Sequence, residues 1–391
     1  MKSLILVLSI VGFTAAMDGG AFPLWDQRRP VPSTAELPQL AKVQFHVIKP
    51  YEFQRDGYRF LHGVALAWHR GTLFASFGHN KGGENTDSEQ ARYTTSRDGG
   101  RTWSEVKTVD PGDEPEIGVS HGVFLIQNDQ LWAFHGAYRG TLQNVHMRAY
   151  RFDESSGDWK SQGVVLQGGF WPLGEPVQLR GGNWIIAGFK VGDGNPPAVA
   201  ISHGNDLTGW DLAAIPVDAS LGKVWGESDI LVDGSQITCI ARYGEQAKAL
   251  VSTSADDGRT WTKACPADLP MATSKPCTGV TSTGQRYLIC STTSDGGGRR
   301  SPLTIAVSRP GETKFSRVFC IRPAVFPEGP GESHEKAALA YPCAVEHEGK
   351  LYVGYSNSGG KAGRIGSGRE LANNNSAELA VIPLESLRWI D

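Results

Sequence analysis

Apolar and polar positions along the chain recur in a fixed order. Each repeat opens at a Gly or Asp turn, continues through an apolar strand, a variable gap and a second strand, and ends in a polar turn with a closing aromatic residue. The closing aromatics follow one another at roughly 50 residues, apart from a longer final gap. We assign six copies: Gly71 to Trp103, Asp129 to Trp159, Gly182 to Trp210, Gly234 to Trp261, Gly284 to Phe315 and Gly349 to Trp389.

A repeat of this length with three or four strands predicts the blade of a β-propeller. Six copies account for residues 41–391, and long helical patterns are absent, so we predict a single all-β domain, a six-bladed β-propeller. The stretch 43–53 (VQFHVIKPYEF) is expected to add a strand that helps to close the ring. Residues 17–40 are rich in Pro and polar side chains, which predicts an extended N-terminal tail.

The first 16 residues have the features of a secretory signal peptide. Lys2 precedes an apolar run from Leu4 to Phe13, and small residues follow up to Ala16. We therefore expect cleavage after residue 16 and a secreted or periplasmic protein. No later segment has 18 consecutive apolar residues, so no association with a membrane is expected.

Charge and cysteine content narrow the possible partners. The chain has 391 residues, of which 38 are basic and 41 acidic, and the formal net charge is −3. This charge provides no basic field for phosphates, which argues against nucleic acid as a main partner. All six cysteines lie in the second half, and their apolar neighbours favour small buried side chains, although an exported protein also permits three disulfides.

Two of the polar turns are nearly identical. Both fit the pattern S-x-D-x-G-x-T-W, in segments 96–103 and 254–261. This pattern resembles the Asp-box of the sialidase (neuraminidase) superfamily. We expect its Asp to accept backbone N–H bonds in a tight hairpin and its Gly to adopt positive φ. The box is therefore interpreted as a marker of the fold.

The resemblance to sialidases extends to candidate catalytic residues. In that family three arginines bind the substrate carboxylate, a tyrosine is the nucleophile, and a glutamate takes its proton. The residues at the matching positions are Arg59 in YRFL, Glu227 in GESD, Arg242 in IARY, Arg300 eight residues before Ser308, and Tyr341 in YPCA. The first and last of these motifs depart from the family patterns F/Y-R-I-P and Y-S-x-L.

The acid/base of the family is an aspartate on the loop before the first Asp-box. The matching stretch here, residues 79–89, offers three carboxylates. Asp87 has the expected residue type, Glu84 lies nearer the expected spacing, and Glu89 is the third alternative.

The repeat itself gives an independent prediction. Inner strands of a propeller begin at the same face, so residues at a fixed distance before each turn should converge on the axis. A Tyr or Glu alone at such a position would be assigned a structural role. The two histidines are interpreted as hydrogen-bonding groups for substrate, since no third ligand at a metal-site spacing is visible. The residues at these positions are His62, His121, Glu175, Glu227, Lys275 and Tyr341.

The resemblance implies an exo-glycosidase that releases terminal sialic acid with retention and needs no metal or organic cofactor. A hydrolase for another acidic sugar, either a uronic acid or a different ulosonic acid, is the alternative within enzymes. A non-catalytic glycan-binding propeller is the alternative outside them. We expect a glycan with a terminal acidic sugar as the partner, and a monomer.

Overall fold

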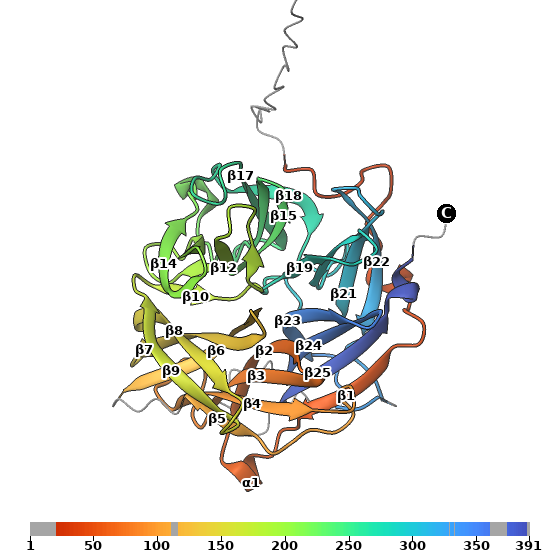
Figure 1. Ribbon diagram of the computed structural model, residues 1–391. Helices are drawn as coiled ribbons and strands as arrows, with labels where there is room; N and C mark the ends of the chain where they lie inside the picture. Colours follow the sequence, from red (N-terminus) through yellow and green to blue (C-terminus); the bar gives the residue numbers. More distant parts are fainter. Residues whose placement is uncertain (1–20, 111–115, 328, 332, 360–373, 389–391) are drawn as a thin grey trace, which may run out of the picture.

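The computed structural model describes residues 21–110, 116–327, 329–331, 333–359 and 374–388, and within them six antiparallel sheets surround a common axis (Figure 1). This arrangement confirms the predicted six-bladed β-propeller. The predicted signal peptide and the last closing aromatic, Trp389, lie outside the described residues.

Each blade is a sheet that runs from an inner strand at the axis to an outer strand. The first three blades are β2 (Phe60–His69), β3 (Thr72–Asn80), β4 (Glu89–Ser96) and β5 (Lys107–Asp110); β6 (Ile117–Gln127), β7 (Gln130–Arg139), β8 (Gln143–Asp153) and β9 (Asp158–Leu166); and β10 (Phe170–Pro172) and β11 (Val177–Gln178) with β12 (Trp184–Lys190), β13 (Pro197–His203) and β14 (Asp206–Ala214).

The last three blades follow the same plan. They are β15 (Ser228–Asp233), β16 (Gln236–Arg242), β17 (Lys248–Ser254) and β18 (Cys265–Pro270); β19 (Cys277–Val280), β20 (Arg286–Cys290), β21 (Leu303–Ser308) and β22 (Phe315–Arg322); and β23 (Ala338–His347), β24 (Lys350–Gly359) and β25 (Asn374–Pro383) with β1 (Gln44–Lys49). The short helices are α1 (Phe53–Asp56) and the 3-10 turns η1 (Thr34–Glu36), η2 (Ala219–Leu221) and η3 (Leu384–Leu387).

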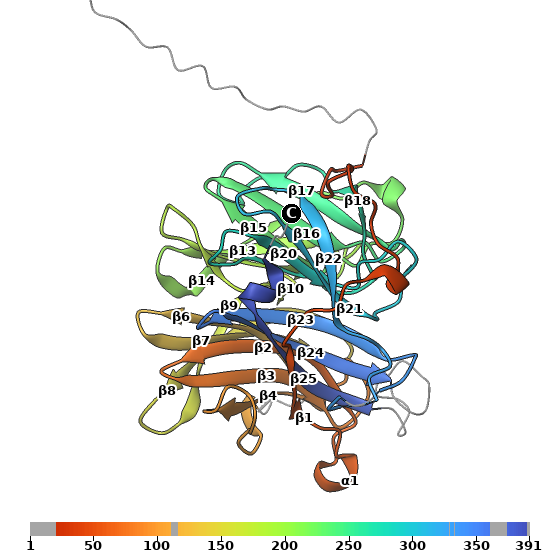
Figure 2. The ribbon, with the colours of Figure 1, turned by 90° about the vertical axis from the view of Figure 1, so that its right-hand side faces the viewer.

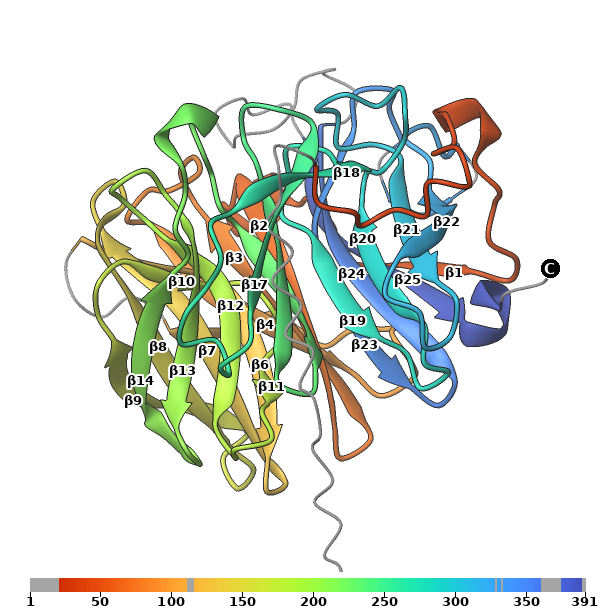
Figure 3. The same cartoon turned by 90° about the horizontal axis from the view of Figure 1, so that it is seen from above.

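Two N-terminal segments pack on the outer edges of later blades. The predicted closing strand is β1, which pairs antiparallel with β25 and forms the outer edge of the last blade. Residues 21–40 run along the outside of the fourth and fifth blades, where Phe22 bridges to Ala267 and Trp25 to Phe315 (Figures 2 and 3). The side chain of Trp25 is buried between these blades, so this segment seals an interface.

The hydrophobic core is divided among the faces between neighbouring blades. One cluster, for example, joins Phe74 and Tyr93 of the first blade to Phe124 and Trp159 of the second. The six cysteines are unpaired thiols, and four of them are buried, as the apolar neighbours of these residues predict. None of the helices among the described residues is long and apolar enough to cross a membrane.

The Asp-box turns have the predicted geometry. Asp98 accepts hydrogen bonds from the backbone N–H groups of Arg101 and Thr102, each at 3.0 Å. Gly100 follows at φ +88°, a conformation that a residue with a side chain rarely adopts. These turns lie at the outer strands and hold no residue of the axial pocket, in line with a structural role.

Candidate active site

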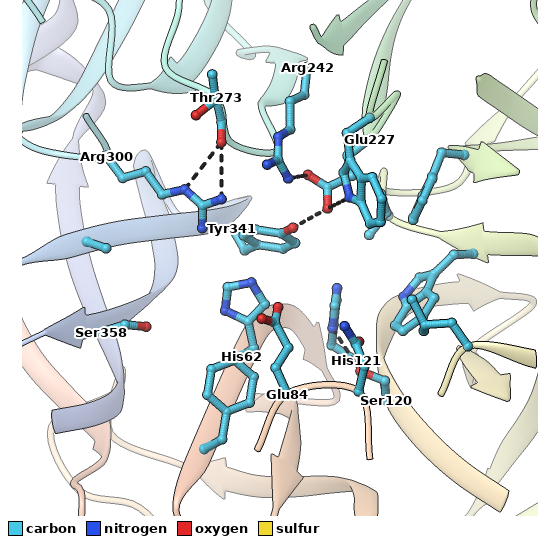
Figure 4. Close-up of a pocket in the computed structure, with 18 of the residues that line it drawn as sticks. His62, Glu84, Ser120, His121, Glu227, Arg242, Thr273, Arg300, Tyr341 and Ser358 are labelled. Carbon is cyan, nitrogen blue, oxygen red and sulfur yellow. Dashed lines mark hydrogen bonds and ion pairs between the residues drawn. The ribbon is translucent and has the colours of Figure 1, made fainter. Parts of the chain in front are cut away.

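An axial pocket of about 540 Å³ is lined by residues from all six blades. It contains Tyr341, Glu227, Arg242 and Arg300, together with both predicted histidines (Figure 4). Indole rings that the sequence analysis did not single out, those of Trp171 and Trp225, form part of its wall. Their positions before or within short inner strands gave no signal that distinguished them from core aromatics.

Irregularities in three inner strands direct side chains into this pocket. A β-bulge adds an unpaired residue to one strand and re-aims the neighbouring side chains. The register of the inner strand shifts between His62 and Val64 on β2, between Val119 and Gly122 on β6, and between Ala340 and Cys343 on β23.

Two of the bulges show strained or crowded backbone. Tyr341 adopts φ +53°, which is uncommon for a residue with a side chain. Gly63 adopts φ +63°, and a Cβ built on it would lie 2.3 Å from Cγ of His121. Glycine at position 63 therefore lets the backbone of β2 pass close to the imidazole of the next blade.

Tyr341 and Glu227 form a buried hydrogen-bonded pair. The Tyr341 hydroxyl donates to Oε1 of Glu227. The same carboxylate accepts from Arg242 Nη1 at 2.8 Å and from Trp225 Nε1 at 3.1 Å. Burial, followed by the nearby Glu227 charge, raises the pKa of Tyr341 well above its ordinary value, so the phenol is neutral in the resting pocket. The Glu227 carboxylate is thus within hydrogen-bond reach of the phenolic proton of Tyr341.

Two of the three predicted arginines reach the pocket. The Arg300 guanidinium lies 5.7 Å from the centre of the Tyr341 ring and donates to the carbonyl of Thr273 at 3.1 and 3.3 Å. Arg242 lies on the same side of the Tyr341 ring in Figure 4 and donates to Glu227. Both side chains keep further N–H donors for an anionic group.

Arg59 is not among the residues that line the pocket, which corrects the prediction for it. Its guanidinium carbon instead lies 4.9 Å from the ring centre of Phe53 in α1. Side chains alternate along an extended backbone, and the next residue, Phe60, faces the pocket. The side chain of Arg59 is therefore directed the other way.

The loop carboxylates separate into two groups. Glu84 and Glu89 line the pocket, whereas Asp87 is exposed and does not, contrary to its expected role. Glu89 is buried at the start of β4, where it accepts from Ser120 Oγ at 2.6 Å and from the Tyr138 hydroxyl. Burial raises the pKa of Glu89 to about 7, although both of these hydrogen bonds oppose the shift.

Both predicted histidines lie against the Tyr341 ring. The ring centres of His62 and Tyr341 are 3.8 Å apart, and those of His121 and Tyr341 are 5.5 Å apart and nearly perpendicular. Burial lowers the pKa of His121 to about 3 and that of His62 well below its ordinary value. Both imidazoles are neutral near pH 7.

The predicted ring of six residues is split between two levels. His121 and Tyr341 also line a narrower cavity behind the pocket, and this second cavity holds Glu175 and Lys275. Glu175 is absent from the lining of the main pocket, so it is not placed to contact a substrate there. The Lys275 ammonium donates to the carbonyl of Pro342 at 2.6 Å and so holds the bulge that carries Tyr341.

No group of three or more His, Cys, Asp or Glu side chains in the described part of the chain has the arrangement of a metal site. The pocket does bring together side chains that can serve as acid, base or nucleophile. It combines a hydrogen-bonded phenol and carboxylate with two guanidinium groups, a set suited to a reaction at a centre beside an anionic group.

Comparisons with known proteins agree with the fold. A family model described as a BNR repeat-like domain matches residues 121–353. No curated protein matches this chain.

Three similar solved structures are a protein of unknown function from Dyadobacter fermentans, the Hadza microbial sialidase Hz136 and a leech intramolecular trans-sialidase. The first has a TM-score of 0.64 at 12% identity, with 88% of this chain and 99% of that chain covered. The Hz136 sialidase has a TM-score of 0.61 at 14% identity, with 84% of this chain and 66% of that chain covered. The leech trans-sialidase has a TM-score of 0.63 at 11% identity, with 84% of this chain and 69% of that chain covered. The chain belongs to the BNR repeat-like domain family and has the propeller fold of the sialidase superfamily.

Proposed function

We propose that this protein is an exo-glycosidase that hydrolyses the α-ketosidic bond of a terminal sialic acid with retention of configuration. The observation that carries the proposal is the buried pair of Tyr341 and Glu227, held by Arg242 and faced by Arg300 in one pocket. Two of the three similar solved structures are named as a sialidase and a trans-sialidase, which supports the same class.

The anionic centre of the substrate explains the choice of nucleophile. A sialic acid has a carboxylate on its anomeric carbon, and a carboxylate nucleophile would be repelled by it. The Tyr341 phenol is neutral until it attacks. Arg300 and the remaining donors of Arg242 would bind the substrate carboxylate with charge-assisted hydrogen bonds.

The proposed reaction has two steps. The Tyr341 oxygen bonds to the anomeric carbon as its proton passes to Glu227, and the bond to the leaving oxygen breaks as that oxygen gains a proton from an acid of the pocket. Water then attacks the anomeric carbon of the glycosyl-tyrosine and passes a proton to the group that acted as the acid, the leaving phenol oxygen regains its proton from Glu227, and sugar of the original configuration departs. Glu84 and Glu89 are the predicted acid/base candidates that line the pocket.

The alternative of another acidic sugar rests on the arginines. Two guanidinium groups face the pocket in place of the expected three, since Arg59 contacts Phe53. A uronic acid or another ulosonic acid also has a carboxylate that guanidinium groups can bind. A binding propeller without catalysis would not need the phenol and carboxylate to be hydrogen-bonded, so we do not favour it.

The experiment is release of the fluorophore from a fluorogenic α-ketoside of N-acetylneuraminic acid by the wild type and Tyr341→Phe. Tyr93→Phe is the matched control, because its hydroxyl bonds to the Gly157 carbonyl outside the pocket. Release by the wild type and control but not by Tyr341→Phe supports the proposal. No release by any protein, with binding of an acidic glycan retained, would exclude sialidase activity.

We also propose that the enzyme acts outside the cytoplasm, because residues 1–16 have the pattern of a signal peptide. N-terminal sequencing of the exported protein tests this, and an intact Met1 would contradict it.

A further inference from the structure

A chain of three side chains connects a buried carboxylate to the pocket. Ser120 Oγ lies 2.6 Å from Glu89 Oε1 and 3.1 Å from His121 Nδ1. All three residues are buried, and all three line the pocket. Gly78 provides the room, because a Cβ there would lie 2.3 Å from Glu89 Oε1 and 2.9 Å from Ser120 Oγ.

The single hydroxyl proton of Ser120 links the two ends. When Glu89 is ionised it can only accept, so Ser120 donates to it and His121 Nδ1–H donates to Ser120. The Nε2 atom of His121 is then a bare acceptor. When Glu89 is protonated the order reverses: Glu89 donates to Ser120, Ser120 donates to Nδ1, and Nε2 carries the proton.

We propose that Glu89, Ser120 and His121 form a proton relay that delivers the leaving-group proton through His121 Nε2. This inference rests on the proposed glycosidase function. As the glycosidic bond breaks, the proton on Nε2 passes to the leaving oxygen, the Ser120 proton passes to Nδ1, and the Glu89 proton passes to Ser120. The carboxylate of Glu89 is left charged, and the imidazole is neutral throughout.

The geometry favours His121 as the group that contacts the substrate. Both Glu89 oxygens are already engaged, one by Ser120 and one by Tyr138. His121 Nε2 is buried and has no hydrogen-bond partner among the described residues, and its ring stands nearly perpendicular to Tyr341, so only a group that reaches the floor of the pocket can meet it (Figure 4). Catalytic hydrogen bonds often form only when substrate binds, so the relay does not require a protein partner for this nitrogen.

The relay avoids a charged imidazole. A general acid needs a pKa near the working pH, and burial holds the pKa of His121 at about 3. The proton is stored instead on Glu89, whose pKa burial raises to about 7. Ser120 and Glu89 are thus positioning residues that act through His121. The groups that face the relay are Glu84 from the preceding loop, Tyr138 and His135 of β7, His62 of β2, Tyr341 of β23 and Lys275.

The tautomer of His121 tests the relay without any substrate. Nitrogen-15 NMR of the histidine side chains, with His121 assigned by its loss in His121→Gln, should show the proton on Nε2 below about pH 7 and on Nδ1 above it. Glu89→Gln and Ser120→Ala should abolish this exchange. A tautomer that stays constant from pH 5.5 to 8.5 in the wild type would overturn the relay, whatever substrate the enzyme uses.

The leaving group provides the second test. An aryl leaving group needs little protonation, whereas the sugar of a sialyllactose does, so Ser120→Ala should slow sialyllactose hydrolysis about 100-fold and aryl sialoside hydrolysis only a few-fold. Ser316→Ala, which removes a buried hydroxyl of β22 that does not line the pocket, is the control. Equal losses on both substrates would overturn the relay but leave the proposed function standing. No hydrolysis of either substrate by the wild type would overturn the proposed function, while the NMR result still decides the relay.

Discussion

Removal of one partner from the ion pair between Arg242 and Glu227 should cost more stability than breaking a surface pair. Their N···O distance is 2.8 Å, and only 17% of the Arg242 side chain and 4% of the Glu227 side chain are exposed. Arg242→Met removes the cation and leaves the carboxylate buried. Tyr341 and Trp225 still donate to Glu227, but neither has a charge.

Removal of one partner from a buried pair costs about 3–5 kcal/mol. Because two hydrogen-bond donors to Glu227 remain, Arg242→Met should lower the free energy of unfolding by about 3 kcal/mol, near the lower end of this range. Glu227→Gln should reduce that cost, because the buried charge is gone. The double variant should therefore show a coupling energy of about 2 kcal/mol between the two positions.

The assay is equilibrium unfolding in urea for the wild type, both single variants and the double variant. Arg70→Met, which breaks an exposed pair with Asp129, should leave the midpoint unchanged. Additive effects of Arg242→Met and Glu227→Gln, with a coupling energy near zero, would refute the reasoning. Glu227 would then not be a buried anion beside Tyr341.

Three further predictions concern single residues. Gly63→Ala should destabilise the fold and weaken activity, because its Cβ would meet His121 at 2.3 Å and the residue has positive φ; an unchanged melting temperature would contradict this. Arg300→Ala should raise KM for a sialoside about 10-fold or more, while Arg59→Ala should leave it unchanged, as steady-state kinetics can show. The pKa of Glu89 is raised from 4.5 to about 7, so the folded state binds its proton more tightly and stability falls as pH rises across this window. In the wild type this effect should lower the free energy of unfolding by about 3 kcal/mol between pH 4.5 and 7, and Glu89→Gln should remove that decrease. Unfolding curves of Glu89→Gln with the same pH dependence as those of the wild type would contradict the prediction.

The repeat pattern was sufficient for the fold, for a physical reason. Each blade needs an apolar inner strand, a turn and an aromatic residue that packs against the next blade. The same pattern of residues is therefore repeated six times along the sequence. Even the closing strand β1 was predictable from the apolar stretch before the first repeat. The path of residues 21–40 across β18 and β22 was not, because it depends on where Phe22 and Trp25 find apolar partners.

The site was predictable in part. Tyr341 and Glu227 were found by two routes, and the structure brings their side chains into contact. The direction of the Arg59 side chain was not predicted. It depends on the alternation of side chains just before β2, which turns Arg59 away from the pocket, and on the contact of its guanidinium with Phe53. Glu175 was placed too near the substrate, since equivalent positions in sequence differ in depth along the axis.

The bulges explain why depth could not be predicted. Each bulge shifts the register of an inner strand by local backbone geometry, and no residue pattern marked the shifts on β2, β6 and β23 in advance. The same shifts present His62, His121 and Tyr341 to one another.

Capture of the covalent intermediate tests the central claim most directly. A 2,3-difluorinated sialic acid should slow breakdown of the glycosyl-enzyme, so that peptide mass spectrometry can locate the sugar. The account predicts one added sugar on the peptide that contains Tyr341, and none in Tyr341→Phe. A sugar found on Glu84 or another carboxylate, or turnover by Tyr341→Phe at the wild-type rate, would contradict it.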